Sequence, residues 1–148
     1  MKRSGAISVL LFIVCTFIPS YAHHLAVVVA KDNGMDEITS SNLAKMFKAE
    51  TRKWPDGKNV VVILRRDSVA QMQTLERLDK MTEADLKAFL AAHKDSVFLA
   101  DTDVDLLKMV ETTPGAIGLV DVHSINDKVK VVKVDGKLPL EKGYLPHH

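Results

Sequence analysis

The sequence has almost no cysteine and no excess of charge of either sign. Its single cysteine, Cys15, is one of 148 residues and lies in a leader that we expect to be removed. A mature chain without cysteine excludes a disulfide framework, a thiolate metal site and a cysteine nucleophile. The 20 Lys and Arg residues are balanced by 19 Asp and Glu residues, which argues against nucleic acid or a membrane surface as the partner.

The first 22 residues have the composition of a secretory signal peptide. Lys2 and Arg3 precede an apolar run over residues 6–18, and Ser20 and Ala22 place small residues where a signal peptidase reads them. The apolar run is too short to span a bilayer, so no membrane anchor is expected after cleavage. We therefore predict a signal peptide over 1–22 and localisation to the periplasm.

The remaining residues, 23–148, are predicted to form one α/β domain, since they are enough for a core of their own. Strand-like apolar runs alternate with amphipathic helical segments. The first runs are apolar throughout, which favours strands buried on both faces of a covered, largely parallel sheet. Strands are expected at 24–31, 59–64, 97–100, 116–120 and 129–134. The polar stretch 32–37 between the first strand and the first helix is expected to be a loop.

Capping residues and apolar spacing predict where the helices begin and which faces they bury. Thr39 is expected to cap a helix that buries residues 43, 46 and 47, and a helix with residues 72, 75 and 78 on its apolar face should follow the second strand. Thr82 is expected to start a helix that buries Leu86, Phe89 and Leu90. Another helix should begin at Asp101 or Thr102.

The segment Arg65-Arg66-Asp67-Ser68 joins the end of the second strand to a helix start, which is a plausible place to bind an anion. A helix amino terminus presents unpaired backbone N–H groups, and a guanidinium group suits phosphate or carboxylate. In the alternative interpretation, the two arginines are surface residues and Ser68 or Asp67 merely caps the helix.

Three segments resemble the PstS-like phosphate substrate-binding proteins of bacterial ABC importers. They are FKAETRKWPDGKNVVVILRRD (47–67), ETTPGAIGLVD (111–121) and VDGKLPLEKGYLP (134–146). The resemblance implies a single lobe of a type II periplasmic-binding-protein-like fold, with a mixed, mostly parallel sheet flanked by helices. Full members of the family are about twice as long, so the chain corresponds mainly to their second lobe.

The resemblance also implies which residues form the anion-binding loop. These ligand-binding residues are Arg65, Arg66, Ser68, Val69, Ala70 and Gln71. Val69 and Gln71 stand where the family has hydroxyl residues that bind phosphate, so two donors are missing. Each lost charge-assisted bond is worth roughly 1.5 to 3 kcal/mol, and the two together would weaken binding about a hundredfold or more. We expect phosphate binding to be weak and to depend on Arg65.

Histidines and carboxylates elsewhere suggest further sites, each with a simpler alternative. His23 and His24 at the expected mature amino terminus, with His147 and His148 at the other end, could chelate Cu(II) or Zn(II); alternatively they are incidental tail residues. Asp101, Asp103 and Asp105 have the spacing of the first calcium-loop ligands, but the rest of that loop is missing, which favours a helix-start role. Neither a catalytic nucleophile with its base nor a cofactor site is predicted.

The sequence therefore predicts a periplasmic, non-enzymatic phosphate- or oxyanion-binding-protein-like domain, accessory to an ABC importer. One alternative is an envelope protein-interaction module that has lost phosphate binding, and another is metal binding through the terminal histidines. A single lobe cannot close around its ligand, so closure would require a homodimer or a partner protein.

Overall fold

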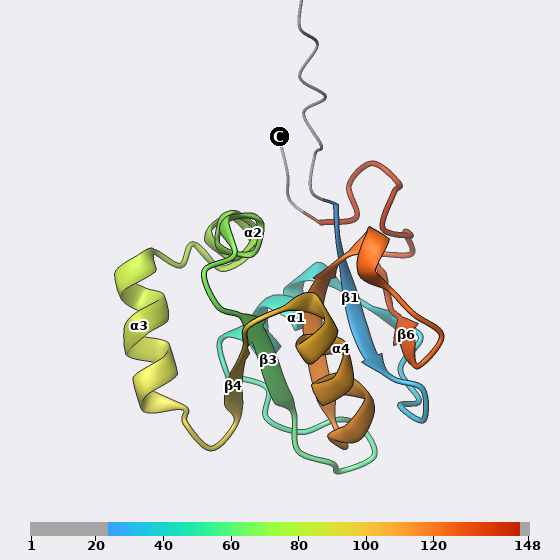
Figure 1. The fold of residues 1–148 in the computed structure, drawn as a ribbon, viewed down its shortest axis with the longest axis horizontal. Coiled ribbons are helices and arrows are strands. Elements are labelled where there is room, and N and C mark those ends of the chain that lie inside the picture. The colour runs from blue at the N-terminus through green and yellow to red at the C-terminus, as the bar shows by residue number, and fades with distance from the viewer. Residues whose placement is uncertain (1–23, 146–148) are drawn as a thin grey trace, which may run out of the picture.

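The computed structural model describes residues 24–145 (Figure 1). The predicted signal peptide and His23, His147 and His148 lie outside these residues. The strands are β1 (Leu25–Ala30), β2 (Glu37–Ile38), β3 (Val61–Arg65), β4 (Val97–Ala100), β5 (Ala116–Asp121), β6 (Val129–Val131) and β7 (Lys133–Val134). The helices are α1 (Ser40–Phe47), α2 (Val69–Asp79), α3 (Glu83–Ala92) and α4 (Asp103–Thr112), with a short 3₁₀ turn, η1 (Val122–Ser124).

The main sheet has the strand order β4-β3-β5-β1-β6. β3 is parallel to β4 and β5, whereas β1 is antiparallel to both of its neighbours, β5 and β6. Four strands therefore run in one direction and β1 runs against them. This confirms the predicted α/β class with a mixed, mostly parallel sheet.

β1 is buried on both faces, as its apolar sequence predicts, but it pairs only antiparallel. Residues 26–29 have no exposed surface. Alternate side chains enter the two cores: Val27 and Val29 join the cluster that contains Leu43 of α1, while Val28 joins the cluster that contains Leu106 of α4. The continuous apolar run thus predicts that both faces of the strand are covered. It does not predict whether the strand pairs parallel or antiparallel.

The helices begin where the capping residues predict. The side chains of Thr39, Thr82 and Thr102 each accept a hydrogen bond from a backbone N–H in the first turn of α1, α3 and α4 respectively. The predicted capping box between Thr82 and Asp85 is present in both directions. None of the helices within residues 24–145 is long and apolar enough to cross a membrane.

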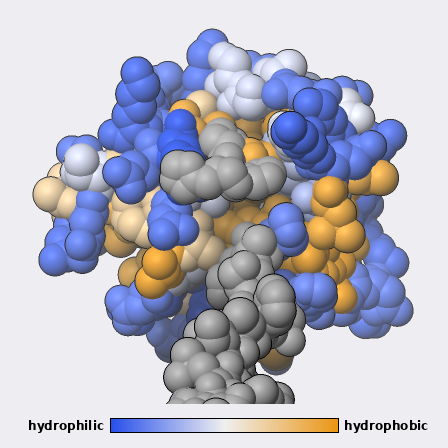
Figure 2. Space-filling view, turned by 90° about the horizontal axis from the view of Figure 1, so that it is seen from above, coloured by the Kyte–Doolittle hydropathy of each residue, from blue (hydrophilic) through white to orange (hydrophobic). Residues whose placement is uncertain are grey.

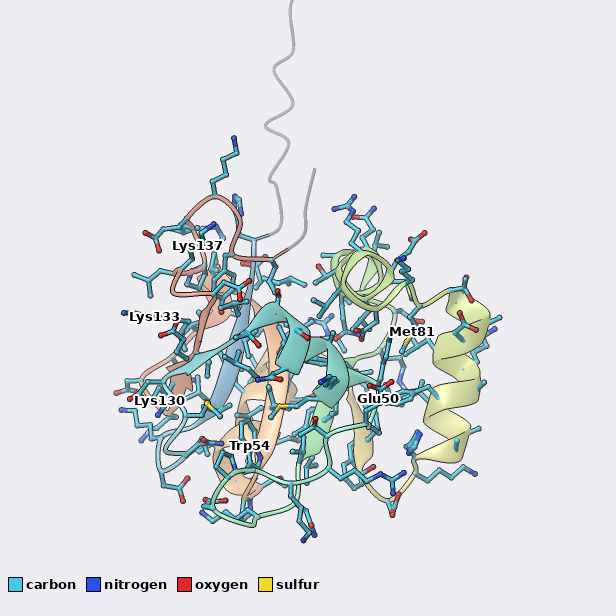
Figure 3. The ribbon with its side chains drawn as sticks, turned by 180° about the vertical axis from the view of Figure 1, so that it is seen from behind. Glu50, Trp54, Met81, Lys130, Lys133 and Lys137 are labelled. Atoms are coloured by element: carbon cyan, nitrogen blue, oxygen red, sulfur yellow. The ribbon has the colours of Figure 1, made fainter. Side chains whose placement is uncertain are left out.

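The burial predicted for α3 is wrong. Leu86, Phe89 and Leu90 are only partly buried, and α3 contains no fully buried residue. The views from both sides draw α3 at the outer side of the edge strand β4, whereas α4 packs against the sheet strands (Figures 1 and 3). The apolar side chains of α3 therefore contact the rest of the domain but remain partly exposed to solvent.

The last predicted strand, 129–134, is divided into β6 and β7. Between them the backbone N–H of Val132 donates to the carbonyl of Val27, and Lys133 and Val134 then pair with β2 in a separate two-stranded sheet. β2 falls at the end of the expected 32–37 loop and was missed, because two residues beside a polar stretch carry no strand periodicity.

Candidate functional site

A crevice of about 560 Å³ opens at the carboxyl ends of β3 and β5. Arg65, the start of α2, Asp103 and Asp121 line it, and Leu25 at the start of β1 completes its wall. The chain leaves β3 through α2 and α3 toward β4, whereas it leaves β5 toward β6 on the other side. Ligands of open α/β sheets bind at such a switch point, outside the carboxyl ends of the strands. Figure 2 looks onto this edge and shows apolar side chains among hydrophilic ones.

The loop between β3 and α2 brings a helix start directly beside Arg65. Asp67 has a left-handed backbone with φ of 54°, and Ser68 follows as the N-cap. The hydroxyl of Ser68 accepts a hydrogen bond from the N–H of Gln71 at 3.3 Å. The backbone N–H groups of Val69 and Ala70 have no partner within the helix, as in any first turn, and both residues line the crevice.

The side chain of Gln71 is bound to the end of β3. Its Oε1 accepts from the N–H of Arg65 at 2.7 Å, and its Nε2 donates to the carbonyl of Arg65 at 3.0 Å. Gln71 is only 2% exposed, so both bonds are shielded from water. The Gln71 amide, predicted to lie in the anion-binding loop, is thus used to fasten α2 to β3. Its place on the buried helix face with Thr74 and Leu75 is the sequence signal for this role.

The guanidinium group of Arg65 forms an ion pair with Asp103 at the start of α4. The second oxygen of this carboxylate accepts from the Ser124 hydroxyl at 2.7 Å. The Arg65 and Asp103 side chains are 27% and 21% exposed, and Nε of Arg65 is buried without a hydrogen-bond partner among the described residues. The side chain that the sequence assigns to an anion is therefore already paired with a carboxylate, and an arriving anion would compete with Asp103.

Arg66 has a different environment from Arg65. Its Nε lies 2.8 Å from Oδ1 of Asp101, but the two side chains are 54% and 73% exposed. Ion pairs between exposed side chains contribute only about 0 to 1 kcal/mol. Arg66 faces solvent outside the 560 Å³ crevice, and Arg77 of α2 is the second cation that lines it.

Val69 separates the crevice from a second hollow. The side chain of Val69 is 71% exposed and lines both spaces. The second hollow has a volume of about 540 Å³ and lies between α2, α3 and β4, where Leu86, Leu90 and Leu99 form much of its wall. The loop that begins at Arg65 thus borders two spaces, and the second exposes more apolar surface than the first although Arg66, Asp67, Glu83 and Lys87 also line it.

Several further polar side chains have structural roles. The indole N–H of Trp54 donates to the carbonyl of Gly115 at 2.8 Å, at the edge of the sheet opposite Arg65. His93 is the C-cap of α3. Asp103 and Asp105 lie in the first turn of α4, as the helix-start interpretation requires. Within residues 24–145, no group of three or more His, Asp or Glu side chains is arranged to hold a metal ion.

A family model described as a PBP superfamily domain matches residues 14–146. The fold is similar to an ABC-type phosphate transport receptor from Vibrio cholerae, with a TM-score of 0.66 and 19% identity over 78% of this chain and 48% of that one. It is also similar to PstS from Borrelia burgdorferi (TM-score 0.58, 18% identity, 78% and 49%) and to a phosphate-binding protein from Stenotrophomonas maltophilia (0.61, 17%, 79% and 40%).

These similarities show the fold, and the chain spans less than half the length of each of these three structures. The search of curated proteins found no match.

Proposed function

The chain belongs to the family of PBP superfamily domains, and we propose that it is a periplasmic, non-enzymatic domain that binds a small oxyanion such as phosphate. The binding place is the crevice at the carboxyl ends of β3 and β5. The solved structures of similar fold carry names of phosphate transport and phosphate binding, which supports this ligand class and a role beside an ABC importer.

The observation that carries the proposal is the junction of Arg65 with the capped start of α2. Ser68, the backbone N–H groups of Val69 and Ala70, and the guanidinium groups of Arg65 and Arg77 border one space. A helix amino terminus and arginine are complementary to a phosphate oxygen in charge and in hydrogen bonding.

Three features support weak binding. Val69 offers no side-chain donor, the Gln71 amide is bound to the backbone of Arg65, and the guanidinium group of Arg65 is paired with Asp103. The first two remove bonds worth roughly 1.5 to 3 kcal/mol each, and the third adds a competing anion. The expected dissociation constant therefore lies well above the submicromolar range.

The proposal that binding is non-enzymatic is supported by the structural bonds of Ser68 and Ser124. Ser68 caps α2, and the hydroxyl of Ser124 donates to Asp103. Because the crevice is open, a homodimer or a partner protein would be needed to enclose the anion fully.

A protein-interaction module is the second candidate function. The hollow between α2 and α3 favours it, because Val69 is exposed and the leucines of α3 are only partly covered. In this alternative, the surface around Val69 and α3 serves as a contact for an envelope protein.

Calorimetric titration with phosphate and sulfate tests the proposal. Calorimetry suits this site better than tryptophan fluorescence, since Trp54 is buried at the opposite edge of the sheet. We expect weak heat of binding with the wild-type protein, no binding with Arg65→Gln, and little change with the matched variant Arg66→Gln. Submicromolar phosphate binding would contradict the weak site, and no binding at millimolar phosphate would favour the interaction module. Mass spectrometry of the secreted protein tests the predicted cleavage after Ala22.

A further inference from the structure

The carboxyl group of Asp79 is buried without a hydrogen-bond partner among the described residues. Asp79 is 5% exposed, and neither of its side-chain oxygens is bonded. It is the last residue of α2, where the helix dipole places partial negative charge. Burial, the missing donors and the helix end all disfavour the ionised form of this carboxyl group.

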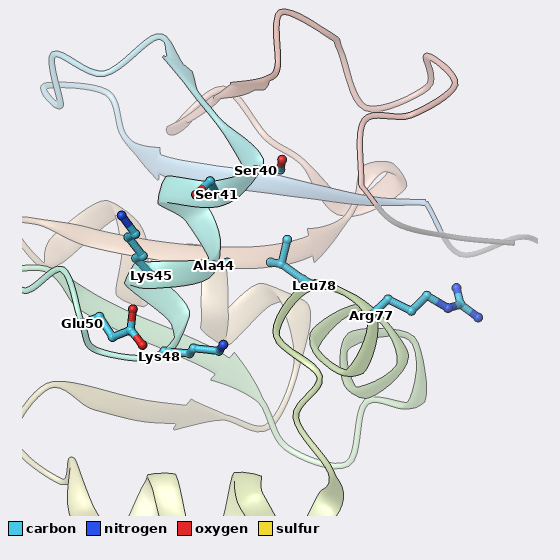
Figure 4. A pocket seen from close by; sticks show the side chains of 8 residues that line it. All are labelled: Ser40, Ser41, Ala44, Lys45, Lys48, Glu50, Arg77 and Leu78. Carbon is cyan, nitrogen blue, oxygen red and sulfur yellow. The ribbon is translucent and has the colours of Figure 1, made fainter.

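Charged groups around Asp79 do not reverse this effect. Burial is the largest influence and raises the pKa of Asp79 to about 7. The positive charge of Lys48, at the C-cap of α1, lowers this pKa, whereas the negative charge of Glu50 raises it. Lys48 and Glu50 line a hollow of about 470 Å³ between α1 and α2, together with Arg77 of α2 (Figure 4). Lys80, the next residue in the chain, is exposed. Asp79 is therefore mostly neutral in mildly acidic solution and mostly ionised in mildly alkaline solution.

Asp79 lies where the chain turns from α2 into α3. Lys80 has a left-handed backbone with φ of 54°, and Met81 after it is only 6% exposed. Figure 3 shows Met81 between α2 and α3, on the side of the molecule where Glu50 follows the end of α1. The residues of α3 that pack against the core, Leu86, Phe89 and Leu90, are only partly buried, so the buried side chains of Asp79 and Met81 lie at the junction of α2 with a helix that is loosely covered.

We propose that Asp79 is a proton-operated latch: its neutral acid keeps the linker seated on the domain, and loss of its proton to solvent favours an opened form in which α3 lifts away. The closed form holds the proton more tightly than an opened form with a solvated carboxyl group. The proton therefore stabilises the closed form relative to the opened form. This stabilisation is complete below the ordinary pKa of an aspartate, near 4, and is lost as the pH rises through about 7. The latch concerns the attachment of α3 and is independent of anion binding.

Amide hydrogen exchange of the full chain, measured from pH 4.5 to 8.5 and corrected for intrinsic exchange, tests the latch. Opening releases one proton between about pH 4 and pH 7. The opening constant of residues 79–92 should therefore rise about tenfold per pH unit up to pH 7 and then level off, to a total of several hundredfold. Asp79→Asn should make this profile flat. Asp127→Asn, which removes an exposed carboxylate at the far side of the sheet, should leave the profile unchanged.

A second variant keeps the test decisive if Asp79→Asn folds poorly. Lys48 is exposed and lowers the pKa of Asp79, so Lys48→Gln should move the levelling point to higher pH. A flat wild-type profile, or a slope that survives Asp79→Asn, would overturn the latch. An equal pH effect on the amides of β5 would overturn it too, because the opening would then be global.

Discussion

Replacing Asp103 by asparagine should strengthen phosphate binding. In the wild-type protein the Asp103 carboxylate holds the guanidinium group of Arg65, and both side chains are largely shielded from water. The amide in Asp103→Asn has the same shape as the carboxylate: its oxygen can still accept from the Arg65 guanidinium group and its nitrogen can donate to the Ser124 hydroxyl, but it carries no charge. Arg65 then keeps its position and is no longer neutralised by a competing anion.

The size of the effect follows from the bond that is weakened. In the wild-type protein both bonded groups are charged, whereas in Asp103→Asn only the guanidinium group is. The attraction between two opposite charges about 4 Å apart is worth about 1 kcal/mol in water and about 4 kcal/mol near a protein surface, and we take the lower part of this range for the partly exposed pair. The difference of about 1 to 2 kcal/mol becomes available to the arriving anion, which corresponds to roughly 5-fold to 30-fold tighter phosphate binding.

Calorimetric titration with phosphate measures this change, and Asp101→Asn is the matched control. Asp101 pairs with Arg66, is removed with the same change in net charge, and is 73% exposed. An exposed pair contributes little, so the control should bind phosphate about as the wild type does. Weaker binding by Asp103→Asn would refute the reasoning, because it would show that Asp103 holds Arg65 in place for the ligand.

Three further substitutions test contacts that hold the crevice and the sheet together, and urea denaturation measures each of them. Gln71→Leu keeps the bulk of the side chain but leaves both backbone groups of residue 65 unpaired, which should cost about 2 to 4 kcal/mol; an unchanged midpoint would show that the two bonds contribute nothing. Tyr144→Phe removes a buried hydroxyl that accepts from one backbone group and donates to another, and it should cost a similar amount, whereas a loss below about 0.5 kcal/mol would contradict this. Gly115→Ala places a methyl group 2.0 Å from the carbonyl oxygen of Asn59 at a φ of 77°, so little folded protein is expected; wild-type stability would be the contrary result.

The sequence predicts most helices and strands of this fold because the signals are local. The apolar run of β1 reports burial on both faces, and Thr39, Thr82 and Thr102 lie at helix starts as expected. The loop with Arg65 and Ser68 is found where a strand end and a helix start are adjacent in the chain.

The features that the sequence could not reveal depend on contacts between distant residues. Arg65 meets Asp103 across 38 positions, and neither residue type nor spacing predicts this pair. The position of α3 beside an edge strand, with its leucines only partly buried, follows from the arrangement of the whole sheet. The direction of β1 is likewise set by its partners and leaves no mark on its own composition.

The position of β1 affects how the protein folds. The first strand of the chain is interior to the sheet, with β5 hydrogen-bonded on one side and β6 on the other. Val27 therefore has no pairing partner until Leu119 has been synthesised. Contacts between such distant positions slow folding, because a long loop must close first. A chain that leaves the ribosome or crosses a membrane amino terminus first therefore presents β1 early and without its partners. The sheet can close only after about nine-tenths of the described residues have emerged.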